Sequence, residues 1–564
     1  MNSKILTYVL KNALDFNGSV NPKAVLGMVL RDDPSLKGDV PGVLKDIEKV
    51  ITEIKPLNQQ QIKEKLQKLS PELLEEKEEV TAGPLKALPN AVKGKVVVRI
   101  APSPSGALHI GHAYGAALNA LYADMYDGKF ILRIEDTNPE NIYPKAYELI
   151  PEDGNWITGD AVTKTIVQSE RLGMYYDCAE KMVAKGQAYV CTCDADEWRE
   201  KKNKGEACPC RDLNKKEQQQ RYAKMFSSYA EGEAVLRLKT DIKDKNPAMR
   251  DFAIMRVNEH IHPKTKKEQR VWPLMVFSVA VDDHDLGITH VLNGKDHADN
   301  AKKEMMIMDC FGWKHPEYKH WGRINFEGFD LSTSKTRLAI EQGEYTGWDD
   351  IKLPFLPALR KRGYQPEAFR KFAAKVGLSL NDKTVSKEEF WKMINAFNRE
   401  IIEPKANRYF AVVDPVKVKI EKAPSKKAMI DLHPDFPQRG KRVLEVKGEV
   451  YLMKKDLDLL VPGKIHRLMD YCNVEMKGKK LGFVSEAYEE YKNSPERGAI
   501  IHWVPVETAL PVEIMMDNGV VKKGFGENSL KDAKKGDIVQ LERQFFARVD
   551  KKGKDKVVFW HLHA

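Results

Sequence analysis

The sequence VVVRIAPSPSGALHIGHAYGAALNALYADMYDGKFILRIE, residues 96–135, predicts a strand, a loop, a helix and a second strand. Its first segment, residues 96–100, is apolar and β-branched except for Arg99, as expected of a short strand. The prolines, serines and glycine of residues 101–106 end that strand, and the Ala- and Leu-rich segment after them has helical spacing. Residues 130–134 form the next expected strand. The stretch therefore predicts an α/β fold.

The start of the expected helix carries two histidines, His109 and His112. A strand that leads through a small-residue loop into a helix N-terminus is a phosphate-binding geometry, because free N–H groups and the positive end of the helix dipole point at the ligand. Residues three apart in a helix lie on one face, so both imidazoles are expected to point in the same direction. The sequence therefore predicts a phosphate site at this helix start.

Composition limits the class of protein. The length of 564 residues suggests roughly four domains. With 42% hydrophobic and 31% charged residues, the chain is too apolar to be disordered. We expect no membrane span and no signal peptide, because no apolar run approaches ~18 residues and the N-terminus is interrupted by polar residues. These features predict a cytoplasmic protein. The net charge of +10 permits a polyanionic partner but does not require one.

Residues 1–80 are predicted to form a small helical module. Apolar residues recur at helical spacing in segments 5–13 and 43–54, with Asn-Gly and Asp-Pro pairs between the helices. An acidic run and a segment with proline and glycine, through Pro89, then predict a linker. The module contains no recognisable chemistry, so we interpret it as an appended interaction module.

The segments after residue 136 continue the α/β pattern. Residues 146–153 and 163–186 are predicted as helices, and a charged helix follows residue 212. Three apolar runs are then predicted as strands: AVLRLKTDI, FAIMRVNE and VWPLMVFSVAVDD. The last run ends in Asp282-Asp283-His284-Asp285, which is either a metal site or a polar loop tip. A further buried strand, GITHVLNGKDH, and a helix from about Asn300 complete this part.

The cysteine pattern suggests a metal site. Seven cysteines, an odd number in a large chain without an export signal, argue against a disulfide framework. Four of them form C-x-C…C-x-C: Cys191, Cys193, Cys208 and Cys210. Four thiolates on a hairpin suit tetrahedral zinc, although C-x2-C spacing is commoner. Four ordinary thiols in a reducing compartment are the alternative. The isolated Cys178, Cys310 and Cys472 are expected to be buried apolar side chains.

Two later segments carry cations that could contact phosphate. Ser332-Thr333-Ser334-Lys335 is predicted as a flexible loop before a helix; a surface loop is the simpler interpretation, but the phosphate site needs a cation. The second segment, residues 352–375, has Phe and Tyr between its basic residues, and it is either a solvated helix face or a surface for phosphate backbone. Its cations are Arg360, Lys361, Arg362, Arg370 and Lys371. Short alternating segments with Gly and Pro turns then predict an all-β region of one or two barrels at 411–564.

The motifs together resemble the class I aminoacyl-tRNA synthetases of the glutamyl/glutaminyl branch. The residues that carry the resemblance are HIGH after APSPSG, LRIEDTNP, STSK, and GWDD with RKRGY and EAFRKF after it. The resemblance implies a multidomain α/β and β protein: a Rossmann-like catalytic domain at 95–345 with an acceptor-stem-binding insertion at about 190–290, a helical connector at 346–410, and a β-barrel anticodon-binding region at 411–564. The helical N-terminal module and the β C-terminus resemble archaeal glutamyl-tRNA synthetases, since bacterial ones carry an α-helical anticodon domain.

The activity that the resemblance implies has two steps. L-glutamate and ATP form glutamyl-adenylate and pyrophosphate with Mg²⁺, and glutamate then passes to the 3′ end of tRNA(Glu), releasing AMP. A monomer is expected. Glutaminyl enzymes usually read PPEPNG where this chain has APSPSG, so the loop resembles the glutamyl enzymes. Whether tRNA(Gln) is also charged stays open.

The resemblance also implies roles for particular residues. The catalytic group would comprise His109, His112, Lys335 and Thr333, because an ungapped register places Thr333 at the usual lysine. ATP would contact His109, Ile110, Gly111, His112, Ser334 and Lys335. Glutamate would contact Arg99, Ala101, Ser103 and Glu135, and tRNA would contact Arg360 and Arg362. A structural ion pair of Arg99 with Glu135 or Asp136 is the alternative for that arginine.

Five positions depart from the family pattern. Met275 replaces a substrate-contacting Tyr, while Val276 and Asn293 replace a polar residue and an Arg. Phe355 and Pro357 replace an expected Thr and Arg. The change at Asn293 removes a second cation for the side-chain carboxylate of glutamate. This change and the one at Val276 motivate a second hypothesis, a tRNA-binding or complex-scaffolding protein with a weakened site.

Overall fold

The computed structural model describes residues 2–15, 18–70, 85–266, 268–478 and 480–564. The chain divides into two units, residues 1–84 and 85–564, which we describe separately. Most of the predicted linker lies outside the described residues. Within the described ranges, no helix is both long and apolar enough to cross a membrane.

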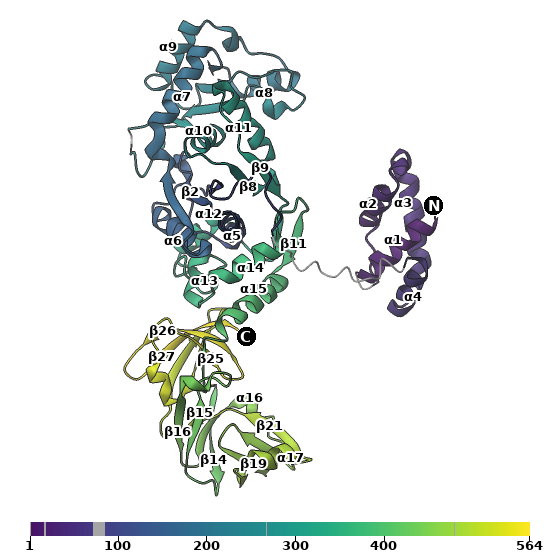
Figure 1. The fold of residues 1–564 in the computed structure, drawn as a ribbon, viewed down its shortest axis with the longest axis vertical. Coiled ribbons are helices and arrows are strands. Elements are labelled where there is room, and N and C mark those ends of the chain that lie inside the picture. Colours follow the sequence, from purple (N-terminus) through teal and green to yellow (C-terminus); the bar gives the residue numbers. More distant parts are fainter. Residues whose placement is uncertain (1, 16–17, 71–84, 267, 479) are drawn as a thin grey trace. The chain divides into compact units, whose positions relative to one another are not determined.

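The first unit is helical, as predicted. Asn21 and Asn58 cap two of its helices by accepting backbone N–H groups, and the apolar faces of the helices share one core that includes Ile5, Val9 and Ile47. The helices are α1 (Asn2–Asp15), α2 (Pro22–Asp32), α3 (Val40–Ile54) and α4 (Gln59–Leu69) (Figure 1).

A parallel sheet lies at the centre of the second unit. Strands β1, β2 and β3 pair in that order, and β8 pairs in parallel with β9. The Thr289 N–H donates to the carbonyl of Val97 (3.0 Å), which places β8 beside β1. The strands are β1 (Val97–Ile100), β2 (Lys129–Ile134), β3 (Val162–Val167), β8 (His290–Gly294) and β9 (Glu317–Trp321), and the helices are α5 (Ile110–Met125), α6 (Ala146–Thr158), α7 (Leu172–Lys185), α10 (Met275–Asp285) and α11 (Ala298–Phe311) (Figure 1). The α/β fold predicted from residues 96–135 is confirmed.

An antiparallel sheet is inserted between β3 and β8. Its four strands pair in sequence order, and Trp272 and Leu236 are buried in its core. The elements are β4 (Ala188–Cys191), α8 (Ala195–Lys204), α9 (Lys215–Met225), β5 (Val235–Leu238), β6 (Ala253–Val257) and β7 (Val271–Pro273).

Three secondary-structure predictions were wrong. Most of the run VWPLMVFSVAVDD is helix α10 rather than a strand, because a continuous apolar run does not distinguish a buried helix from a buried strand. Residues 162–167 are strand β3, although 163–186 was predicted as one helix. The third error concerns Ser332–Lys335: helix α12 (Thr333–Glu341) begins inside this segment, and Ser332 caps it by accepting the Lys335 N–H.

A largely helical segment links the parallel sheet to an all-β region. It begins with β10 (Ile324–Glu327) and α12, and the range predicted as the connector then contains α13 (Leu356–Arg362), α14 (Pro366–Val376), β11 (Lys383–Ser386) and α15 (Lys387–Ile402). Helices α14 and α15 share a core with β1, β2 and α5 through residues such as Phe372 and Phe390. The connector is therefore continuous with the hydrophobic core of the parallel sheet.

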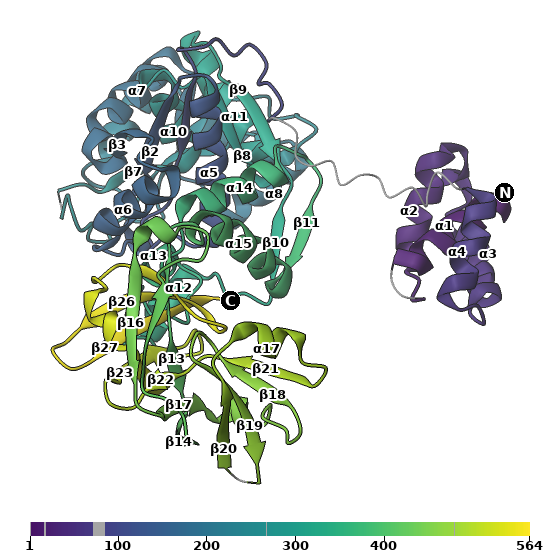
Figure 2. The same ribbon diagram turned by 60° about the horizontal axis from the view of Figure 1, so that its bottom comes forward.

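The all-β region contains two seven-stranded sheets (Figure 2). In the first sheet, the two edge strands β12 and β13 are sequence neighbours on either side of Phe410, so the sheet nearly closes into the predicted barrel. Its order is β12 (Asn407–Tyr409), β25 (Ile538–Leu541), β26 (Phe545–Lys552), β27 (Val557–His563), β23 (Leu510–Met515), β24 (Val521–Gly526) and β13 (Ala411–Val413).

The second sheet and a ribbon complete the region. The sheet order is β21 (Arg497–Ile501), β18 (Ile465–Leu468), β19 (Cys472–Lys477), β20 (Lys480–Ser485), β14 (Pro415–Glu421), β17 (Glu449–Met453) and β22 (Val504–Pro505). The ribbon pairs β15 (Lys426–Asp431) with β16 (Lys441–Val446), and two short helices are α16 (Lys454–Leu457) and α17 (Tyr488–Asn493).

Arg362 joins the connector to the last strand. Its side chain is buried, Nη2 donates to the carbonyl of Leu562 (2.6 Å), and Nε donates to the carbonyl of His561 (3.2 Å). Arg362 thus has a structural role at β27, and it also borders a cavity. The tRNA contact predicted for it stays a prediction.

We predict that Arg362→Ala lowers the free energy of unfolding by about 2–3 kcal/mol, because it leaves two carbonyls without their charged donor. Urea denaturation followed by tryptophan fluorescence measures the change. Arg360→Ala on the same helix is the control; its partly exposed pair with Glu152 should contribute less than about 1 kcal/mol. Equal losses in both variants would contradict the structural role of Arg362.

Candidate active site

Helix α5 begins with both histidines folded onto its own N-terminus. His109 is the N-cap, and its Nδ1 accepts the Gly111 N–H (3.0 Å). His112 Nδ1 in turn accepts the His109 N–H (3.2 Å), and the two ring centroids lie 3.8 Å apart. The histidines thus face the same way, as predicted, but their rings occupy two of the N–H groups that were expected to be free for phosphate.

The hydrogen bonds and the burial of these rings fix their chemistry. Because each Nδ1 is an acceptor, each neutral ring carries its proton on Nε2. Burial lowers the pKa of His112 to about 4. Burial, and then the neighbouring His112, lower the pKa of His109. Both imidazoles are therefore neutral at pH 7, and each offers one Nε2–H donor.

The APSPSG loop is held on both sides. The carbonyl of Pro102 accepts the N–H of Glu135 (3.0 Å), which ties the loop to the end of β2. At Gly106, an added Cβ would lie 2.4 Å from the Trp348 ring and 2.5 Å from the Thr333 methyl group. Only glycine fits there, so the loop, the start of α12 and the GWDD motif pack directly against one another.

A pocket of about 300 Å³ lies between this loop, α5 and β8. It is lined by all four residues predicted to contact glutamate: Arg99, Ala101, Ser103 and Glu135. Gly111 and His112 line it as well. The structure thus brings the amino-acid candidates and the helix start together. Ser334 and Lys335 do not line it; Lys335 borders a different cavity, next to Arg362 and Tyr364.

Asp283 forms a buried ion pair with Arg99. Its Nη2 and Nε donate to the two carboxylate oxygens at 2.9 and 3.2 Å, and both residues are buried. The ion pair considered for Arg99 exists, but its partner is Asp283 rather than Glu135 or Asp136. No hydrogen bond of Nη1 occurs among the described residues, so this nitrogen is left for a ligand.

The Asp282–Asp283 pair belongs to the site, not to a loop tip. Asp283 also accepts from Arg133 (2.8 Å), and Asp282 accepts from Arg171 (2.7 Å) and Tyr175 (2.8 Å). Each carboxylate is paired with arginine, as buried charges require, and neither is available to a metal ion. Sequence reasoning missed these residues as partners of the pocket, although the DDHD run at the end of an apolar segment was a signal.

Glu135 contributes a carboxyl group to the lining of the pocket. Burial raises the pKa of its carboxyl to about 7, against the opposing effects of Arg133 and Arg99. A cationic group bound beside Glu135 would compensate for this burial and favour the ionised carboxylate.

The departures from the family pattern lie close to the site. Met275 and Asn293 both line the pocket, and Asn293 Oδ1 is hydrogen-bonded to His320 Nδ1 (2.7 Å). Val276 is buried outside the pocket lining. Phe355 packs edge-on against the His109 ring (5.7 Å), and Pro357 occupies the first turn of α13.

The basic stretch is largely neutralised within the protein. Arg360 pairs with Glu152 (2.9 Å) and Lys361 with Asp349 (2.8 Å). Arg370 pairs with Asp124, and Lys371 with Glu400. These pairs connect α13 and α14 to neighbouring elements. Arg360, Lys361 and Lys371 remain 28%, 33% and 46% exposed, so a surface for phosphate backbone stays a prediction.

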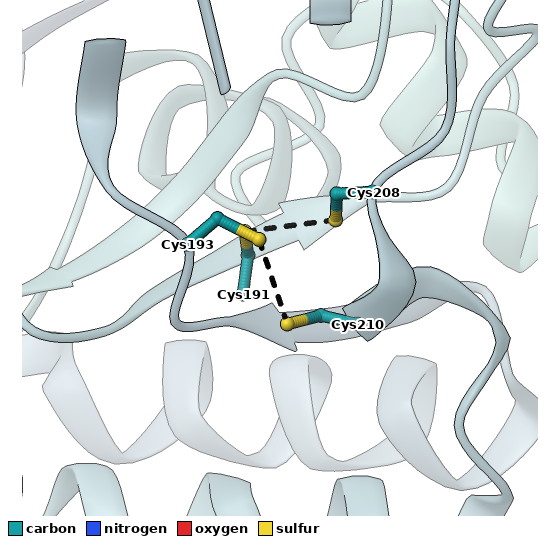
Figure 3. A group of neighbouring side chains, drawn as sticks. All are labelled: Cys191, Cys193, Cys208 and Cys210. Atoms are coloured by element: carbon teal, nitrogen blue, oxygen red, sulfur yellow. Dashed lines mark hydrogen bonds between the residues drawn. The ribbon is translucent and has the colours of Figure 1, made fainter. Parts of the chain in front are cut away.

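The four cysteines of the predicted metal site converge (Figure 3). The sulfur of Cys191 lies 3.7 Å from that of Cys208, and the sulfur of Cys193 lies 3.8 Å from that of Cys210. All four sulfurs lie within 4.8 Å of one another, and none forms a disulfide. A tetrahedron with Zn–S bonds of ≈ 2.3 Å has edges of roughly 3.8 Å, so the cluster fits zinc. Outside it, Cys178 and Cys472 are buried and Cys310 is half-buried.

Comparison with known proteins agrees with this geometry. Residues 95–404 match the family described as "tRNA synthetases class I (E and Q), catalytic domain". Residues 406–492 and 500–550 match two anti-codon binding domains of the same class.

Three archaeal relatives, each named glutamate–tRNA ligase, match along the whole chain. The Methanothermobacter thermautotrophicus protein is 44% identical over 561 residues, covering 99% of each chain. The Pyrococcus furiosus protein is 43% identical over 574 residues, again covering 99% of each chain. The Methanocaldococcus jannaschii protein is 42% identical over 565 residues and covers 100% of both. On these matches and on the pocket at the start of α5, the chain belongs to the class I aminoacyl-tRNA synthetases of the glutamate and glutamine family.

Proposed function

We propose that this chain is a glutamate–tRNA ligase acting in the cytoplasm. It activates L-glutamate with ATP to glutamyl-adenylate and pyrophosphate, and it then transfers glutamate to the 3′ end of tRNA(Glu), releasing AMP. The observation that carries the proposal is the single pocket shared by Arg99, Glu135 and the first turn of α5. One site can therefore hold an amino acid and present it to a phosphate bound at the helix start.

The amino acid is held by opposite charges. Arg99 offers Nη1 to a carboxylate, and Glu135 holds the α-ammonium, while Ala101 and Ser103 border the substrate. This pocket also argues against a protein that only binds or scaffolds tRNA. Its buried charged side chains line a cavity that can hold a ligand, in addition to pairing with one another.

The phosphates of ATP are bound at the start of α5. His109 and His112 donate from Nε2 to oxygens that become more negative in the transition state, and Gly111 lets adenosine approach the backbone beside Ile110. Neutral donors suit this role, because they stabilise developing charge without having to lose a proton. Mg²⁺ enters with ATP as part of the substrate and shares the phosphate charge.

The pyrophosphate contact comes from the start of α12. Thr333 packs against Gly106 beside the pocket, whereas Ser334 and Lys335 are exposed and Lys335 borders the other cavity. We infer that Thr333 contacts the leaving pyrophosphate with α12 in the observed conformation. Lys335 would contact it only after the first turn of α12 moves.

The tRNA is assigned to three surfaces. The insertion would hold the acceptor stem, the β region would read the anticodon, and Arg360 is the one predicted contact that remains partly exposed. The N-terminal helical unit is proposed as an interaction module, and a monomer is expected.

We propose zinc for the cluster of Cys191, Cys193, Cys208 and Cys210. When bound, the ion would supply no chemistry to the reaction and would cross-link the segment between β4 and α9, which includes α8. The cluster lies outside the pocket, and Arg221 Nη1 lies 3.3 Å from the Cys210 sulfur, which stabilises a thiolate there. The metal would thus shape the insertion.

The proposed function predicts glutamate-dependent exchange of pyrophosphate into ATP when tRNA is present, followed by charging of tRNA(Glu). Radiolabelled exchange and charging assays with separated tRNA isoacceptors measure both steps. Exchange with glutamine and not with glutamate would assign the chain to the glutaminyl branch, and tRNA binding without exchange would contradict the proposal.

We predict that His109→Ala lowers the activation rate by roughly 10²–10³-fold, because it removes a donor to the transition state. Filter binding should show unchanged tRNA affinity. The lost part of the rate should be constant between pH 6 and 8, since the lowered pKa of each ring keeps it neutral throughout. The control is His315→Ala, a partly exposed histidine paired with Asp309. An equal loss of tRNA binding would indicate a folding defect instead.

Purified protein should contain one zinc per chain by elemental analysis. Cys191→Ser with Cys208→Ser should abolish zinc binding and lower the melting temperature, because the turn of the insertion loses its cross-link. Cys310→Ser, outside the cluster, should retain the metal. Zinc-free protein with normal thermal stability would show that the four residues are ordinary thiols.

A further inference from the structure

Glu304 is a buried carboxylate that the proposed chemistry does not use. It lies on α11, is 3% exposed, and lines the same pocket as Arg99 and Glu135. A pocket that takes glutamate must admit a second carboxylate besides the reacting one. An additional acid on its wall therefore needs an explanation.

The groups around Glu304 come from four elements. Tyr318 on β9 donates to Oε2 (3.1 Å), and Arg99 Nη2 on β1 lies 4.0 Å from the same oxygen. Asp283 on α10 and Arg133 on β2 complete the charged surroundings. Because Arg99 already donates twice to Asp283, Glu304 lies near this guanidinium without a hydrogen bond to it.

This arrangement leaves Glu304 between two protonation states. The pKa of Glu304 is raised to about 7, chiefly by burial; Arg99 opposes this rise and Asp283 contributes to it. An ionised Glu304 would repel a carboxylate that approaches Arg99 Nη1. A protonated Glu304 would remove that repulsion and add an O–H donor.

The protonation of Glu304 is important because position 293 carries an uncharged asparagine. Asn293 borders the pocket where the family pattern has a cation, and its side-chain oxygen is hydrogen-bonded to His320. The pocket therefore has no additional positive side chain there to offset another carboxylate. Loss of the negative charge on Glu304 would offset the second carboxylate of the substrate, as a cation at position 293 would.

We propose that Glu304 is a specificity-determining residue for the side-chain carboxylate of glutamate, and that it takes up one proton from solvent when that carboxylate enters beside Arg99. The inference rests on the proposed function. The proton balance is simple: the carboxylate oxygen of Glu304 binds H⁺, no covalent bond of the substrate changes, and the proton returns to solvent when the site empties.

The test is the KM for glutamate in tRNA-dependent exchange, measured from pH 6.0 to 8.5. KM should rise above pH 7 and approach a tenfold increase per pH unit, because binding then requires a proton that the free site has lost. Glu135 titrates in the same range with the opposite sign, since its ionised form binds the ammonium. A KM that is constant or falls with pH would overturn the proposal.

Two variants separate Glu304 from other sources of pH dependence. Glu304→Gln should abolish the rise in the KM for glutamate above pH 7, leaving only the fall with pH caused by Glu135, and it should leave the KM for ATP unchanged. Tyr318→Phe removes a donor that favours the ionised carboxylate, so the rise in KM should begin at higher pH. The matched control is Asp299→Asn, an exposed acid on the same helix, which should keep the wild-type profile. A rise in KM above pH 7 that persists in Glu304→Gln would overturn the proposal.

Calorimetry distinguishes failure of this inference from failure of the proposed function. Absence of glutamate-dependent exchange at every pH would contradict the function. Glutamate binding at pH 7.5 in two buffers with different ionisation enthalpies would then still decide the inference, which holds only if binding takes up protons and Glu304→Gln loses that uptake.

Discussion

The buried bridge Arg99–Asp283–Arg133 is the interaction on which the site depends. It joins β1, β2 and α10, and all three side chains are at most 6% exposed. Removing one partner of such a bridge leaves an uncompensated buried charge and costs about 3–5 kcal/mol. The bridge therefore fixes both the position of the pocket arginine and the packing of α10 against the parallel sheet.

Charge near this bridge is balanced locally, and the two halves of the site achieve this balance in different ways. The amino-acid half contains full charges, Arg99 and Glu135, whose electrostatic effects partly cancel. The phosphate half contains neutral histidines, because burial keeps His109 and His112 unprotonated. In the proposed function, the first arrangement suits a zwitterion with an acidic side chain, and the second would stabilise charge that appears only during the reaction.

The sequence allowed more to be predicted about local elements than about long-range partners. Residues 96–135 follow the predicted order because strand, loop and helix signals there depend on adjacent residues. Asp283 lies far from Arg99 in the chain, so no spacing rule could identify it as the partner. Helix α10 was misassigned because its burial removes the polar face that reveals a helix. The sequence around Arg362 suggested a phosphate ligand, because the packing of this residue against the distant strand β27 leaves no signal in the neighbouring residues.

The same reasoning explains how a glutamate pocket can lack the second cation found in related enzymes. A dicarboxylate can be accommodated by adding a positive side chain or by removing a negative one. Asn293 rules out the first route at its position, and the second costs the protein nothing in packing, because a carboxyl group and its protonated form have almost the same volume. Selectivity in this pocket is then set by a proton on Glu304 and not by another arginine. That makes the affinity for the acidic substrate depend on the buried Arg99–Asp283 pair, which holds Arg99 in place while the neighbouring Glu304 changes its charge.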